Sequence, residues 1–150
     1  METTKIYLGS DHGGFLLKRD LYAFLTEKGY TVEDCGVYTE ESSDYPDYAK
    51  TVCQQVLQEE NSIGILVCGT GIGMSIAANK IDGIRAALCQ EPLSAKLARA
   101  HNNANILCLG GRLIGYLMAH SIVEVFLHTA FDGGRHAHRL SLIQTLEKGK

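Results

Sequence analysis

The densest group of potentially reactive residues is a cysteine followed by alternating glycines. Cys68 runs directly into the sequence GTGIG, residues 69–73. Glycines at alternate positions permit tight turns, and they let several backbone N–H groups converge on one anion, either a phosphate or an oxyanion. The spacing differs from the dinucleotide-binding fingerprint, and the Gly-Lys-Ser/Thr of a P-loop does not follow. A plain structural turn is the alternative interpretation of these glycines.

Cys68 is the cysteine whose position favours reactivity. Cys89 and Cys108 lie in apolar runs, and Cys53 falls on the apolar stripe of an expected helix, where a free cysteine commonly acts as a small hydrophobic residue. Cys35 has no chemistry that its position suggests. The N–H groups after Cys68 would favour a thiolate, which can serve as nucleophile or base. On position alone, catalysis and packing explain Cys68 equally well.

Two histidines lie where acid–base chemistry is possible. Asp11 and His12, in the sequence SDHGG, follow an apolar run and suit proton transfer to a hydroxyl. Alternatively, Asp11 caps a helix with His12 exposed beside it. His101 and Asn102 come at the end of an expected helix, where a histidine either complements the helix dipole or acts as a general acid or base.

The sequence DGGRHAHR, residues 132–139, places cationic groups at the start of the last expected helix. Positive charge there opposes the helix dipole, which favours anions at this end. A bound phosphate would remove the conflict, because Arg135 and Arg139 are four residues apart and share one face of the helix. Arg112, after another apolar run, could join them. The alternative is a solvated basic face.

The alternation of short apolar runs with helical periods predicts the fold that must position these residues. We expect one domain, residues 1–150, with an α/β fold: a doubly wound, Rossmann-like, five-stranded parallel sheet with helices on both faces, an α/β/α sandwich. Each strand should be buried, and ligands should bind at the carboxyl ends of the strands. The expected strands are 5–10, 31–35, 63–68, 84–89 and 105–109, and the expected helices centre on 17–25, 49–57, 75–80, 92–100, 116–129 and 136–148.

Composition narrows the class of protein. The net charge of -3 is scattered along the chain, and no apolar run approaches the roughly 20 residues of a membrane span, so we expect neither a nucleic-acid nor a membrane partner. Five cysteines without close pairs or His partners at ligand spacing argue against a disulfide framework and a structural metal site. A cytoplasmic protein with reduced thiols fits these features.

Seven motifs, in order over nearly the whole chain, resemble the type B ribose-5-phosphate isomerases. They are SDHGG (10–14), DYP (44–46), CGTGIG (68–73), SIAANK (75–80), GIRA (83–86), HN (101–102) and GGRH (133–136). The resemblance implies a five-stranded parallel sheet and a small-molecule sugar phosphate as substrate. It also implies a homodimer, possibly paired into a tetramer, with active sites shared between subunits and without a metal or organic cofactor.

The resemblance also implies residue roles. Cys68 would be the base, and His101 the acid that opens the sugar ring, assisted by Asp11. The enediolate would be stabilised by Gly69, Thr70, Gly71, Ile72 and Gly73. Asn102 and Tyr45 would contact sugar hydroxyls. The phosphate site would comprise His12, Arg112, Arg135, His136 and Arg139, some of them from the partner chain.

The reaction that the resemblance implies is the interconversion of ribose 5-phosphate and ribulose 5-phosphate in the pentose phosphate pathway. One subgroup of the family replaces the cysteine by serine and uses a glutamate base, but here Cys68 is present and residues 73–75 read Gly-Met-Ser. Two alternatives remain open: a six-carbon substrate, allose 6-phosphate or galactose 6-phosphate, and a non-catalytic sugar-phosphate binding module. For catalysis, we expect the thiol, the loop amides and an imidazole to meet at one edge of the sheet.

Overall fold

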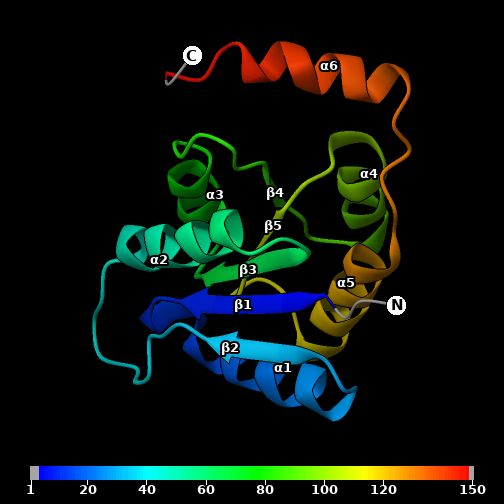
Figure 1. Cartoon of the computed structure of the whole chain (residues 1–150). Coiled ribbons are helices and arrows are strands. Elements are labelled where there is room, and N and C mark those ends of the chain that lie inside the picture. The colour runs from blue at the N-terminus through cyan, green and yellow to red at the C-terminus, as the bar shows by residue number, and fades with distance from the viewer. Residues whose placement is uncertain (1–3, 149–150) are drawn as a thin grey trace.

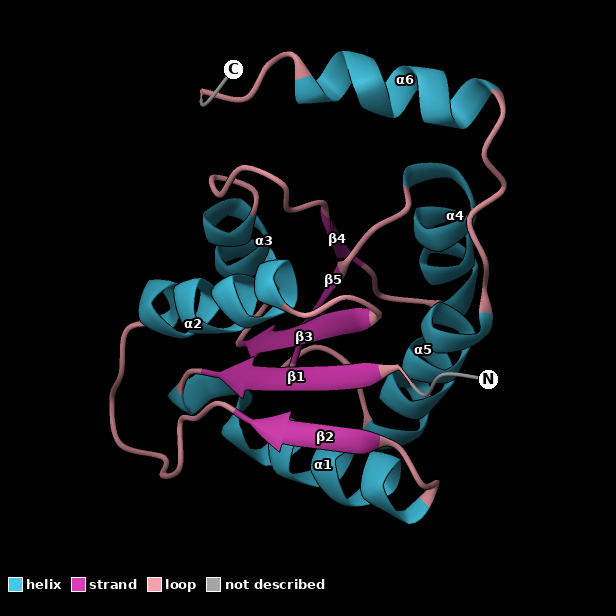
Figure 2. Ribbon diagram, in the orientation of Figure 1, coloured by secondary structure: helices cyan, strands magenta, loops and turns pink. Residues whose placement is uncertain are grey.

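The computed structural model describes residues 4–148 and contains one five-stranded, fully parallel sheet (Figure 1). The strand order is β2-β1-β3-β5-β4, which confirms the expected fold class. Figure 2 shows the arrowheads of β1, β2 and β3 at the same edge, as parallel pairing requires. The strands are β1 (Lys5–Ser10), β2 (Thr31–Asp34), β3 (Ser62–Cys68), β4 (Ala86–Leu88) and β5 (Ile106–Gly110).

Helices cover both faces of the sheet. One face packs against α1 (Phe15–Glu27), α4 (Pro92–Asn102) and α5 (Tyr116–His128), with Phe126 and Leu21 fully buried between sheet and helices. The other face packs against α2 (Tyr45–Gln58) and α3 (Ile72–Ala78). The apolar stripes predicted for these helices are the faces that they bury, as their spacing of three and four residues requires.

The two edge strands differ from the expectation that every strand is buried. Along β2, Thr31 and Glu33 are exposed while the alternate residues are half-buried, and β4 is half-buried throughout. An edge strand pairs on one side only, so part of its surface stays in contact with solvent. Both strands are also shorter than predicted, whereas the central strands β1, β3 and β5 are almost completely buried.

Two helix boundaries were predicted wrongly, and both affect the site. Helix α3 begins at Ile72 rather than Ser75, because Gly71 adopts a left-handed conformation (φ 80°) and its carbonyl accepts the first helical hydrogen bond, from the Ser75 N–H (3.1 Å). Helix α6 (Arg135–Gln144) ends before residue 148. After it, the Glu147 carboxylate accepts a hydrogen bond from the Gly83 N–H (2.9 Å), which ties the end of the described chain to the segment before β4.

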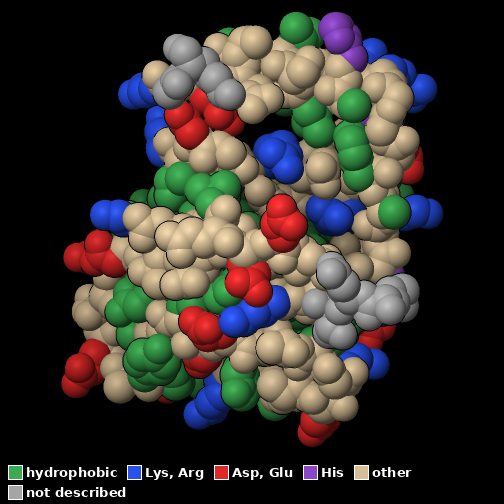
Figure 3. Space-filling view, viewed as in Figure 1, with side chains coloured by type: hydrophobic (Ala, Val, Ile, Leu, Met, Phe, Trp, Pro, Cys, Tyr) green, Lys and Arg blue, Asp and Glu red, His purple; other side chains and the backbone are tan. Residues whose placement is uncertain are grey.

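Helix α6 stands apart from the rest of the fold. It has no buried residue, and its contacts with other elements are mainly with α4. Figure 3 shows a hollow beneath it, with apolar and cationic side chains at the edge. Among the helices of residues 4–148, none combines the length and the apolar character that crossing a membrane requires.

Candidate active site

The crevice between the carboxyl ends of β1 and β3 is the place where this fold would hold a ligand. From β1 the chain turns to β2 on one side, and β3 begins the other half of the sheet, so the strand order reverses between β1 and β3. The loop after β1 lies directly against the end of β3. A Cβ atom on Gly14 would come within 2.3 Å of the Val67 carbonyl oxygen, so only glycine fits this approach.

Cys68 directs its sulfur at the glycine loop. The Sγ atom accepts a hydrogen bond from the Gly71 N–H at 3.2 Å, and the residue is only 5% exposed. The Thr70 hydroxyl accepts one from the Ile72 N–H (3.2 Å). A hydrogen bond from an amide stabilises a sulfur anion more than a neutral thiol. The local geometry therefore places a nearly buried sulfur beside an aimed amide donor at the carboxyl end of β3.

The other four cysteines lack such an environment. Burial raises the pKa of Cys35 to about 11, of Cys53 to about 12 and of Cys89 to about 11, and it raises the pKa of Cys108 well above its ordinary value. These groups are therefore neutral thiols near pH 7. This agrees with the packing role predicted for Cys53, Cys89 and Cys108.

Asp11 and His12 lie at the same edge and have defined partners. Asp11 is buried, and one of its carboxylate oxygens accepts a hydrogen bond from the Gly14 N–H (3.1 Å), so the capping alternative is observed for Asp11, whereas His12 is half-buried rather than exposed. His12 and Ser43 form two reciprocal hydrogen bonds. The His12 backbone N–H donates to the Ser43 hydroxyl (3.0 Å), and the His12 ring Nδ1 accepts from the Ser43 backbone N–H (3.1 Å). This fixes Nδ1 as an acceptor and leaves Nε2 as the ring atom that can donate to a ligand.

Tyr45 and Arg112 complete the group at this edge, which we call the thiol half-site: Asp11, His12, Tyr45, Cys68, Gly69, Thr70, Gly71 and Arg112. A Cβ atom on Gly73 would lie 2.6 Å from the Tyr45 ring, and one on Gly69 would lie 3.5 Å from the Arg112 side chain. Ile72 and Gly73 belong to the first turn of α3 rather than to the loop. Gly73 therefore makes room for the Tyr45 ring.

The remaining predicted residues form a second group, the imidazole half-site: His101, Asn102, Arg135, His136 and Arg139. His101 and Asn102 end α4, and the other three lie in the first turns of α6. The rings of His101 and His136 are stacked, with their centroids 4.2 Å apart and their planes 10° from parallel. Desolvation lowers the pKa of His136, and the nearby His101, Arg135 and Arg139 lower it further.

The two half-sites lie at opposite edges of the sheet within one chain. Cys68 pairs with Gly110 at the carboxyl end of β5, whereas His101 precedes the amino end of β5 at Ile106. Figure 1 shows α4 and the start of α6 on the side opposite the arrowheads of β1 to β3. The length of β5 separates them by about 13 Å along the strand direction. Within one chain, the thiol and the imidazole therefore do not meet at one edge of the sheet, because a helix that leads into a strand ends at that strand's amino edge.

The comparisons with known proteins identify the family. The model of the Ribose/Galactose Isomerase family matches residues 6–143. The chain belongs to this family.

Individual relatives agree over almost the full length of this isomerase. It is 47% identical to ribose-5-phosphate isomerase B of Escherichia coli (strain K12) over 144 residues, which cover 96% of this chain and 97% of that protein. The structure of ribose-5-phosphate isomerase B of Clostridium thermocellum superposes with a TM-score of 0.95 at 49% identity, covering 97% of this chain and 99% of the other. A ribose 5-phosphate isomerase of Thermotoga maritima gives a TM-score of 0.94 at 58% identity, with coverage of 96% and 99%.

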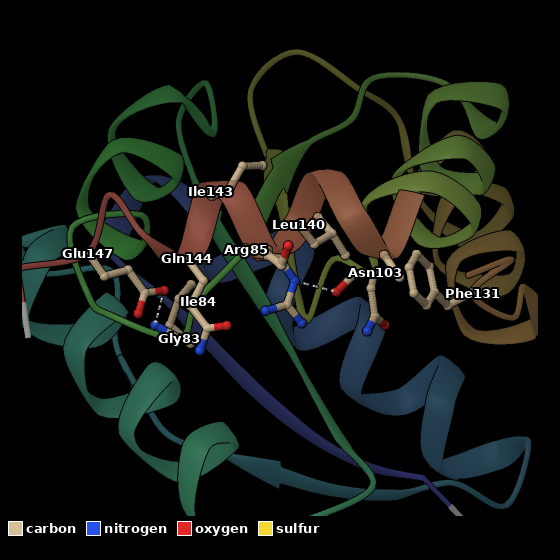
Figure 4. Close-up of a pocket in the computed structure, with 11 residues that line it drawn as sticks. Gly83, Ile84, Arg85, Asn103, Phe131, Leu140, Ile143, Gln144 and Glu147 are labelled. Atoms are coloured by element: carbon tan, nitrogen blue, oxygen red, sulfur yellow. Dashed lines mark hydrogen bonds between the residues drawn. The ribbon is translucent and has the colours of Figure 1, made fainter. Parts of the chain in front are cut away.

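A cavity of about 300 Å³ lies beneath α6 of the isomerase, between this helix and the segment before β4 (Figure 4). Its lining includes Arg85 and Phe131, and the Arg85 Nε–H donates to the Asn103 carbonyl (2.9 Å). None of the residues of the thiol half-site lines this cavity. The residues of the imidazole half-site do not line it either, so the cavity is separate from both half-sites within the single chain.

Sequence reasoning missed residues that position the isomerase's thiol half-site. Ser43, the partner of His12, looks like an ordinary loop residue. Lys18 is only 1% exposed although it lies in a helix, and it pairs with Asp34 (2.7 Å) and donates to the Val37 carbonyl, so it anchors the segment that leads to Ser43. The available signal in the sequence was the position of Lys18 directly after Leu17, on the apolar face of α1.

Proposed function

We propose that the protein interconverts ribose 5-phosphate and ribulose 5-phosphate through a cis-enediolate, as a step of the pentose phosphate pathway. The observation that carries the proposal is the Cys68 sulfur facing the Gly71 N–H at the carboxyl end of β3, next to β1. A base beside aimed amide donors is what proton abstraction next to a carbonyl needs. The E. coli relative is named ribose-5-phosphate isomerase B, which supports the five-carbon substrate.

Cys68 is the group that moves the proton in this mechanism. Its thiolate removes the proton from the carbon next to the carbonyl and returns it to the neighbouring carbon. Negative charge grows on the enediolate oxygen, where the N–H groups of the loop and the Thr70 hydroxyl can donate. One aimed donor of this kind contributes roughly 2.7–4 kcal/mol to transition-state stabilisation in acyl transfer, and the same physics applies here.

Ring opening needs an acid, and we assign this role to His101 of a second copy of the chain, assisted by Asp11 of the first. The assignment follows from the separation of the half-sites: a general acid must come within about 3 Å of the atom it protonates, and β5 alone spans about 13 Å. Asn102 from the same helix end, and Tyr45 from the thiol half-site, would contact the sugar hydroxyls.

The phosphate site is shared in the same way. His12 offers its Nε2, and Arg112 lies over Gly69 in the thiol half-site. Arg135, His136 and Arg139 would come from the partner, where an anion relieves the positive charge at the start of α6. Holding the phosphate far from the reacting carbons fixes the orientation of the sugar.

A second copy of the chain also explains the exposed apolar surface. Helix α6 carries Leu142 and Ile143 at 53% and 48% exposure, and Leu117 of α5 is 84% exposed. Surfaces of this kind mark sites of association. We therefore propose a homodimer with two shared sites. The single domain over residues 1–150, the cytoplasmic location and the absence of nucleic-acid partners stay predictions.

A direct isomerase assay tests the proposal. Purified protein is given ribose 5-phosphate, with allose 6-phosphate in a parallel reaction, because the family description includes a six-carbon sugar. We expect a clearly higher kcat/KM for the five-carbon substrate. A preference for allose 6-phosphate would show that the proposed substrate is wrong, and it would leave the proposed mechanism unaffected. Binding of both sugar phosphates without turnover would favour the non-catalytic module.

A further inference from the structure

Three metal-ligand side chains converge beside the end of α4. Ligand atoms of His101, Asp132 and His136 all lie within 4.8 Å of one another. Asp132 has no part in the proposed isomerisation. Two imidazoles with one carboxylate form a donor set that suits divalent transition metals such as Zn²⁺.

The backbone conformation between α4 and α6 brings these three side chains together. The Asp132 N–H donates to the Ala100 carbonyl (2.9 Å), which fixes the acidic residue next to the last turn of α4. Gly133 and Gly134 then take positive φ angles of 72° and 57°, conformations that turn the chain at once into α6. The His136 N–H closes the turn on the Gly133 carbonyl (3.1 Å). The carboxylate and the second imidazole therefore return to the same side of α4.

The donor atoms of the cluster are available. Within residues 4–148, no hydrogen bond is recorded for the side chains of His101, Asp132 or His136, and their ordered contact is the stack of the two rings. The two stacked rings must splay apart before a nitrogen of each can point at a shared ion, and the broad imidazole torsion permits such a rotation.

We propose that His101, Asp132 and His136 bind a divalent transition-metal ion of the Zn²⁺ class, and that this ion excludes the sugar phosphate. The exclusion rests on the proposed function, which gives His101 to ring opening and His136 to the phosphate, whereas the binding of the ion does not. Arg135 and Arg139 repel the cation, and Asp132 together with the carbonyl end of α4 attracts it. The ion is therefore an inhibitor in competition with substrate, and it has no part in the isomerisation.

The test measures binding of Zn²⁺ to the full-length protein by competition with a chromogenic chelator. We expect one site per chain, with affinity reduced at least about tenfold in His136→Ala and in Asp132→Asn, because even supporting residues of metal sites contribute that much. His138→Ala is the matched control: His138 is an exposed imidazole on the same helix but outside the cluster. Its affinity should equal that of the wild type. Because α6 has no buried residue and Asp132 is exposed, these variants should fold normally.

Two outcomes would overturn the metal site. The first is an affinity in His136→Ala equal to that in His138→Ala. The second is a Co²⁺ complex of the wild type whose spectrum is dominated by thiolate-to-cobalt charge transfer, which would place the ion on cysteines. Ribose 5-phosphate should weaken the apparent Zn²⁺ affinity. If the metal binds as expected but the sugar phosphate has no effect on it, the exclusion is wrong and the site stands, whatever the isomerase assay shows.

Discussion

Subunit complementation tests the division of the site between two chains. Cys68→Ser removes the thiol and His101→Asn removes the imidazole, and each variant alone should be nearly inactive. When the two are mixed and allowed to exchange subunits, a hybrid dimer has one site with both residues intact and one site with neither. Random exchange makes about half of the dimers hybrid, so the mixture should regain about a quarter of wild-type activity.

The magnitude follows from the geometry. The half-sites lie about 13 Å apart along β5, several times the reach of a catalytic hydrogen bond, so a single chain gains nothing from its own distant residue. A matched mixture of wild type with the double variant sharpens the test. If the sites are shared, hybrids have no intact site and activity falls to about a quarter of that of all-wild-type protein. If each site lay within one chain, about half would remain.

The assay is isomerase activity after a cycle of dissociation and reassociation, with hybrid formation verified by native mass spectrometry of chains that carry tags of different mass. Activity no higher than that of the parent variants, in a mixture shown to contain hybrids, would refute the shared site. A wild-type and double-variant mixture that keeps half of the activity would refute it independently.

Three further predictions follow from individual contacts. Alkylation with iodoacetamide near pH 7 should modify Cys68 first, and substrate should protect it. Burial raises the pKa of Cys35 and Cys89 from 9.0 to about 11, which lowers their thiolate fraction about a hundredfold. Peptide mapping that finds another cysteine labelled first would contradict this prediction. In denaturant titrations, Gly71→Ala should lower the free energy of unfolding by about 1–3 kcal/mol more than Gly29→Ala does. Both glycines have positive φ, but only at Gly71 would the new Cβ meet Leu88 (2.5 Å) and the Leu109 backbone. Equal losses in the two variants would show that the contact is relieved. Arg139→Ala should raise KM for ribose 5-phosphate with little change in kcat. The control is Arg19→Ala, which replaces an exposed arginine on α1 and should change neither constant. A loss confined to kcat would remove Arg139 from the phosphate site.

The fold was predictable where the pattern of apolar residues is unambiguous. The runs that became β1, β3 and β5 are buried on both faces, so nearly every position is apolar and the strands stand out. The edges were harder, because β2 contains Glu33 and Asp34 and a strand paired on one side tolerates them. The start of α3 was missed because Gly73 looks like a loop residue, and only the structure shows that the ring of Tyr45 requires a glycine there.

The arrangement of the candidate site was predictable only where neighbouring residues in the chain decide it. Cys68 and the glycine loop are contiguous, so their proximity follows from the chain itself. The positions of His101 and Arg135 depend on which end of the sheet α4 and α6 reach. The direction of β5 decides which end that is. Ser43 could not be found because its role is a pair of hydrogen bonds to His12 across 31 residues of chain.

The role of Cys68 as the base is tested most directly by comparing turnover with binding in Cys68→Ala. We predict that kcat for ribose 5-phosphate falls by at least about 10²–10⁴, the usual contribution of a general base. The Kd for the same sugar phosphate, measured by calorimetry, should stay within a few-fold of the wild type, because the phosphate is held by other residues. A variant that retains near-normal kcat would contradict the account.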